Sequence, residues 1–149
     1  MFTNPQNNKS PVFVHSLFRS GSTYLFNTFR RSDHDKYWCY QEPLHEHLLQ
    51  LNANQHLGQS EKVANYLRHP ELKSPYYHEY QHISDEIPKY FKNEFSYEQY
   101  FVSKDDKISQ LKEYFGFLSS SAKGRPVFQC CRTTGRVENL KTECGGVHI

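Results

Sequence analysis

Residues 11–31 read PVFVHSLFRSGSTYLFNTFRR, and this stretch decides the fold. Residues 12–14 are apolar and predict a short buried strand, while residues 19–22 are small or polar and predict a turn. From about Ser22 the apolar residues recur at the spacing of one helical face, and the two arginines near the end suit the negative end of a helix dipole. The stretch therefore predicts a strand, a loop and a helix in succession.

Three later segments continue this pattern. KYWCYQEP (36–43) predicts a short aromatic strand stopped by Pro43, which can also begin the next helix. RPVFQCC (125–131) predicts a third strand, residues 137–143 a helix, and GGVHI (145–149) the start of a fourth strand. Strands that alternate with helices are typical of an α/β domain with a mainly parallel sheet, which is the fold class that we expect.

The remaining segments set the domain organisation. Residues 1–10 predict a disordered lead-in, and residues 44–121 predict a helical insertion between the second and third strands. Residues 96–99 fit a helix capping box. Since such a domain would not normally end on the first residues of a strand, we expect residues 1–149 to form a single domain that is incomplete at its C-terminus.

The composition restricts the class of partner. Of the 149 residues, 36% are hydrophobic and 23% charged, as in a globular domain, and the net charge of +2 gives no general attraction to nucleic acid or to a membrane. We therefore expect neither as a partner, and any anion site has to be local. The four cysteines contain no C-x-x-C pair and are interpreted as reduced packing thiols. With no signal peptide and no stretch of transmembrane length, we expect a cytoplasmic protein.

The turn has the composition of an anion site. A glycine and serine loop that leads into a helix N-terminus offers unpaired N–H groups and the positive end of a dipole. A nucleotide P-loop would read G-x-x-x-x-G-K-[ST], whereas residues 16–23 read SLFRSGST and lack both the first glycine and the lysine. The cation is Arg19, which precedes Gly21. This departure argues against an ATP or GTP hydrolase.

The same residues resemble a known family. Residues 19–23, RSGST, are similar to the 5′-phosphosulfate loop of sulfotransferases that use 3′-phosphoadenosine 5′-phosphosulfate (PAPS). Some branches of that family place a glutamate just after the second strand, where this chain has Glu42. Their third strand ends in a Lys-Ser/Thr-Pro motif, which Arg132 and Thr134 alter here. The arginine and serine that bind the 3′-phosphate in the family would lie beyond Ile149.

The resemblance implies a P-loop-like, three-layer α/β/α fold and transfer of a sulfuryl group, without a metal, from PAPS to a hydroxyl or amine of a carbohydrate or other small acceptor. Arg19 would neutralise charge on the leaving oxygen, Glu42 would act as the base with His45 in reserve, and Arg132 would contact the sulfuryl oxygens or the acceptor. The cofactor-binding residues implied are Arg19, Ser20, Gly21, Ser22, Thr23 and Tyr24.

Other interpretations of these residues remain. The loop could simply cap a helix and bind nothing, and Glu42 could cap a helix begun by Pro43. A metal site around residues 42–47 is disfavoured because HEH lacks the H-E-x-x-H spacing. Tyrosines between residues 76 and 100 could form an acceptor pocket or stack on bases, although core packing is favoured. Arg136 is expected on a helix surface or beside a partner carboxylate.

Two other functions stay open. The chain could be a truncated, non-catalytic product or an anion-binding module. It could also be a divergent nucleotide-dependent kinase, although the lysine that such an enzyme needs in the loop is absent.

Overall fold

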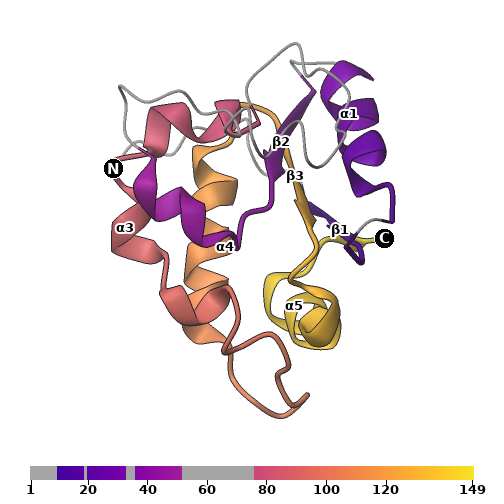
Figure 1. Ribbon diagram of the computed structural model, residues 1–149. Helices are drawn as coiled ribbons and strands as arrows, with labels where there is room; N and C mark the ends of the chain where they lie inside the picture. The colour runs from indigo at the N-terminus through magenta and orange to yellow at the C-terminus, as the bar shows by residue number, and fades with distance from the viewer. Residues whose placement is uncertain (1–9, 19, 33–35, 52–75) are drawn as a thin grey trace.

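The computed structural model describes residues 10–18, 20–32, 36–51 and 76–149. Its strands are parallel and form one sheet in the order β2-β3-β1-β4 (Figure 1). They span Val12–His15 (β1), Tyr37–Gln41 (β2), Arg125–Cys130 (β3) and Val147–His148 (β4). The predicted α/β class with a parallel sheet is therefore confirmed.

The two central strands are β3 and β1. Val12 lies opposite Val127 of β3 and Val147 of β4, and Tyr40 of β2 lies opposite Phe128. Since all the strands run in the same direction, their carboxyl ends share one edge of the sheet. In open α/β sheets, ligands bind outside this edge.

Each face of the sheet packs against helix. Helix α1 (Ser22–Ser32) buries Phe26 in a cluster with Val12, Val14, Cys39 and Val127. Phe13, Tyr40 and Phe128 point to the other face, because successive side chains of a strand alternate, and join the larger core there. Helix α4 (Ser109–Ser121) adds Phe115, whose ring contacts those of Phe13 and Phe128. Figure 1 shows α1 and α4 on opposite sides of the strands.

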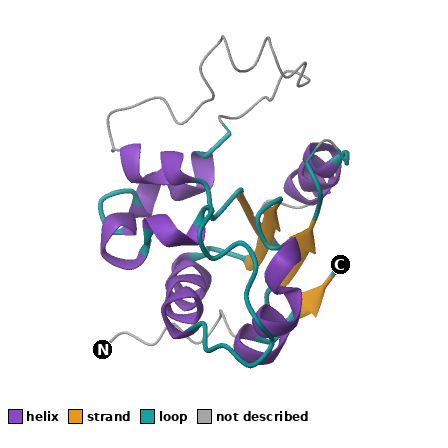
Figure 2. Cartoon of the chain, turned by 60° about the horizontal axis from the view of Figure 1, so that its bottom comes forward, coloured by secondary structure: helices purple, strands orange, loops and turns teal. Residues whose placement is uncertain are grey.

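The expected helical insertion falls partly on residues 52–75, which lie outside the described residues, as do residues 1–9 of the expected lead-in. The described part of residues 44–121 consists of helices and loops (Figure 2). Besides α4 they are the 3₁₀ helices η1 (Glu46–Gln50), η2 (His78–Ile83) and η3 (Asn93–Phe95), and helix α3 (Ile87–Tyr90). After β3 come η4 (Thr134–Arg136) and α5 (Val137–Cys144). In the described ranges, no helix combines the length and apolarity needed to cross a bilayer.

Two local predictions are wrong. Pro43 does not begin a helix, because the N–H of His45 donates to the carbonyl oxygen of Glu42 in a turn, and η1 begins only at Glu46. The capping box at residues 96–99 does not form either. The hydroxyl of Ser96 is buried and donates to the carbonyl oxygen of Leu44 at 2.8 Å, so it caps no helix.

Candidate functional site

Glu42 lies directly after β2 in a backbone conformation that non-glycine residues seldom adopt, with φ +45°. Its N–H donates to the carbonyl oxygen of Gln129 at 2.7 Å, which fixes this turn to β3. Such strain is common at functional sites, where the surroundings hold the residue in place. Here it directs the carboxylate toward the end of β3.

The Glu42 carboxylate is buried against the turn that follows β3. It accepts the N–H of Cys131 at 3.2 Å, and its Oε2 lies 3.2 Å from Nη1 of Arg132. The two side chains are only 8% and 6% exposed, so this is a buried ion pair. Sequence motifs more than 80 residues apart therefore meet at one edge of the sheet.

Aromatic and acidic side chains surround the guanidinium group of Arg132. Its guanidinium carbon lies 5.7 Å from the centre of the Phe18 ring and 5.4 Å from that of Tyr97. Nη2 donates to the Tyr97 hydroxyl at 3.4 Å and lies 3.5 Å from Oε2 of Glu46. Burial alone would lower the pKa of Arg132, but the Tyr97 hydrogen bond and the two carboxylates outweigh it and raise the pKa. Arg132 is thus a fixed cation.

The loop between β1 and α1 contributes backbone donors. Gly21 has φ +83°, which lets the chain turn into α1 at Ser22. The N–H of Ser20 donates to Leu17 and that of Tyr24 to Gly21, so these two groups are used inside the loop. The donors that remain for an anion are those at the first positions of α1, where a helix has no acceptors of its own. Arg19 lies outside the described residues.

Cys131 joins the loop to the end of β3. Its sulfur lies 3.4 Å from the Ser16 hydroxyl and 3.8 Å from that of Ser22, while Gln129 donates to the Ser16 hydroxyl at 2.9 Å. Burial, followed by the charge of Glu42, raises the pKa of Cys131, so the thiol stays protonated and is a poor nucleophile. We interpret Cys131 as packing that sets the spacing between the loop and Arg132.

His45 is uncharged at neutral pH. Burial, and then the charge of Arg132, lower its pKa to about 4. Its Nδ1 accepts the N–H of His47 at 3.1 Å, which places the proton of the neutral ring on Nε2. In this arrangement His45 has no free nitrogen lone pair with which to take a proton from a substrate hydroxyl, as a base would have to do.

Arg136 requires a correction. It is buried rather than on a helix surface, and its Nη2 donates to the carbonyl oxygens of Phe95 at 2.6 Å and Arg132 at 3.0 Å. Burial lowers its pKa to about 10. Its role is to tie the turn after β3 to the insertion.

Sequence reasoning missed a histidine pair near the same edge. Nδ1 of His15 lies 2.8 Å from the hydroxyl of Thr133, and its Nε2 lies 2.9 Å from Nδ1 of His148. Burial and the charge of His148 lower the pKa of His15 to about 4. Because β1 and β4 are adjacent only in the folded sheet, no local signal in the sequence connects these two residues.

Other expected features take a different form. Tyr76, Tyr77 and Tyr80 are buried in the core, whereas the exposed Tyr97 reaches Arg132. Over the described part of the chain, no three His, Cys, Asp or Glu residues are grouped to hold a metal ion.

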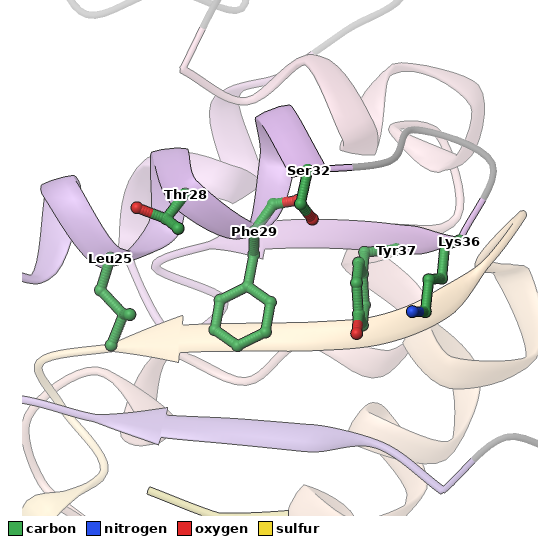
Figure 3. Close-up of a pocket in the computed structure, with 6 residues that line it drawn as sticks. All are labelled: Leu25, Thr28, Phe29, Ser32, Lys36 and Tyr37. Carbon is green, nitrogen blue, oxygen red and sulfur yellow. The ribbon is translucent and has the colours of Figure 1, made fainter.

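A groove of about 360 Å³ lies at the amino end of β2, far along the strand from Glu42 (Figure 3). It is lined by Leu25, Thr28, Phe29, Ser32, Lys36 and Tyr37.

Comparison with known proteins adds no relative. No protein family, curated protein or solved structure matches the chain. The functional interpretation therefore depends on the residues and their geometry.

Proposed function

We propose that this edge of the sheet is the active site of a PAPS-dependent sulfotransferase, in a P-loop-like, three-layer α/β/α domain. One observation carries the proposal: the loop before α1, Glu42 and Arg132, which separate motifs of the sequence single out, lie together. Phe18 of the loop stacks on Arg132, and Arg132 pairs with Glu42. Burying an ion pair costs desolvation that apolar residues would avoid, and a binding role for Arg132 would account for that cost at this edge.

The residues present fit an anion with several oxygens. The first N–H groups of α1, with the hydroxyls of Ser22 and Thr23, would hold the 5′-phosphate. The Nε of Arg132 is buried and has no hydrogen-bond partner among the described residues, so it can donate to a further oxygen. When bound, PAPS would supply an activated sulfuryl group.

Glu42 is proposed to take the proton of the acceptor hydroxyl or amine, which would come from a carbohydrate or other small molecule. Each carboxylate oxygen can accept about two hydrogen bonds, and Oε1 has one described partner, the N–H of Cys131. Arg132 would stabilise charge on the transferred group, a role whose loss typically costs about 10²- to 10³-fold in rate. Arg19 would neutralise the leaving oxygen.

A second candidate, a non-catalytic anion-binding module, is favoured by the carboxylate contacts. Glu42 is already engaged by Arg132 and by a backbone N–H, as expected of a carboxylate that only holds the arginine in place. A divergent kinase is the third candidate and would instead require binding of ATP with Mg²⁺.

Thermal unfolding with added ligands separates the three. At about 100 times its Kd, 3′-phosphoadenosine 5′-phosphate (PAP) would stabilise the fold by about 2.7 kcal/mol and raise Tm by about 5–10 °C. Ser22→Ala combined with Thr23→Ala should reduce this shift, whereas Thr28→Ala on the same helix should not. A shift with ATP and Mg²⁺ alone favours the kinase, and no shift with either nucleotide refutes both enzyme proposals. Release of PAP from PAPS with candidate acceptors then distinguishes an enzyme from a binding module.

A further inference from the structure

Two carboxylates share the charge of Arg132, and they differ in their freedom to move. Glu42 is 8% exposed and fixed by the N–H of Cys131. Glu46 is 40% exposed and stands at the first position of η1, with its Oε2 3.5 Å from Nη2 of Arg132. Glu42 is therefore a permanent partner, whereas Glu46 can rotate into water.

Tyr97 holds Glu46 in this position. Its hydroxyl donates to Oε1 of Glu46 at 2.9 Å and accepts from Nη2 of Arg132 at 3.4 Å. Nδ1 of His45 lies 3.3 Å from Oε2 of the same carboxylate, but it accepts the N–H of His47 and so donates no hydrogen bond to Glu46. Partial burial would raise the pKa of Glu46, but hydrogen bonds from its own N–H and from Tyr97, with the charge of Arg132, lower it. Glu46 is therefore ionised at neutral pH.

The charges around Arg132 do not favour an anion while Glu46 is in place. One guanidinium faces two carboxylates, and His45 is neutral at pH 7, so the immediate surroundings carry a net negative charge. An incoming anion meets repulsion from Glu46 and competes with it for Nη2. The 3.5 Å contact between Glu46 and Arg132 includes no hydrogen bond, because Oε2 of Glu46 is buried without a hydrogen-bond partner among the described residues. A ligand oxygen that accepts a hydrogen bond from Nη2 can therefore replace this contact.

We propose that Glu46 is an internal counter-ion, held by Tyr97 on the solvent side of Arg132, and that an oxyanion ligand, a sulfate, sulfonate or phosphate group, displaces it on binding. The inference rests on the proposed function for its location, but it requires only that Arg132 binds an anion. It assigns to residues 46 and 97 a role in ligand selectivity, since a neutral ligand would have no reason to displace Glu46.

Glu46→Gln tests this with inorganic sulfate, PAP and an uncharged ribonucleoside, adenosine, titrated by calorimetry at constant ionic strength. We expect sulfate and PAP to bind about three- to tenfold more tightly to Glu46→Gln than to the natural chain, with no gain for adenosine. Tyr97→Phe keeps the ring beside Arg132 and removes the hydroxyl, so it should give a smaller gain. Glu94→Gln, an exposed change of equal charge on η3, controls for net charge.

The inference is overturned if Glu46→Gln binds sulfate no more tightly than Glu94→Gln does, or if no form of the chain binds sulfate. Its failure is distinguishable from that of the proposed function. Tighter sulfate binding by Glu46→Gln without sulfuryl transfer from PAPS supports the counter-ion and refutes the enzyme. Transfer from PAPS with sulfate affinity unchanged in Glu46→Gln supports the enzyme and refutes the counter-ion.

Discussion

Replacement of Glu79 should strongly destabilise the fold, because this residue neutralises a buried arginine of α1. Nε and Nη2 of Arg30 donate to the two carboxylate oxygens of Glu79 at 2.8 and 2.6 Å. The side chains are 6% and 7% exposed. Glu79→Leu would leave the guanidinium without its carboxylate in a medium of low polarity, which costs about 3–5 kcal/mol. Since 1 kcal/mol corresponds to about 2–4 °C at this size, Tm should fall by about 6–20 °C.

Urea unfolding followed by circular dichroism measures this loss. The double variant Arg30→Met, Glu79→Leu removes both charges and should recover most of the stability, because apolar side chains of similar volume replace buried ion pairs at little cost. The exposed pair between Lys112 and Glu143 is the control, and Glu143→Gln should cost less than about 1 kcal/mol. A loss below about 1 kcal/mol in Glu79→Leu, or no recovery in the double variant, would refute the reasoning.

Two further predictions concern backbone space and pH. Gly135→Ala should destabilise the fold by about 1–3 kcal/mol, because the new Cβ would meet the Tyr100 carbonyl oxygen. Gly116→Ala, in open space on α4, should instead stabilise the fold by about 0.5–1 kcal/mol. Equal effects of the two variants in urea unfolding would contradict this reasoning. The pKa values of His15 and His45 are lowered to about 4, so near pH 5 the unfolded chain binds protons that the folded chain excludes, and stability should fall from pH 6.5 to pH 4. His15→Asn should flatten this fall, and an unchanged pH dependence in that variant would argue against a neutral His15.

The strands were predictable because their pattern is local. Apolar runs bounded by glycine and proline gave three of the strands within a few residues of their observed bounds. Glu42 and Arg132 were each placed at the end of a predicted strand, and parallel strands bring their carboxyl ends to one edge of a sheet. Both inferences need only neighbouring residues and the rules of sheet geometry.

What could not be predicted depends on contacts distant in sequence. Serine is a common helix cap, but the hydroxyl of Ser96 donates instead to the carbonyl oxygen of Leu44, 52 residues away in the sequence. Arginine is typical of surfaces, but Arg136 can be buried because it donates hydrogen bonds to the carbonyl oxygens of Phe95 and Arg132. Tyr97 carries no sequence signal of its own, because its role depends on how the insertion folds back over Arg132.

The central place of β1 has a kinetic consequence. This strand comes first in the chain, yet its hydrogen-bonded neighbours are β3 and β4, and β2 also pairs with β3. Val12 can pair with Val127 only after the intervening residues are synthesised, which at about 5–20 residues per second takes roughly 6–23 s. During that time β1 and β2 lack the strand that joins them, so the nascent chain exposes two unpaired strands that are prone to aggregate.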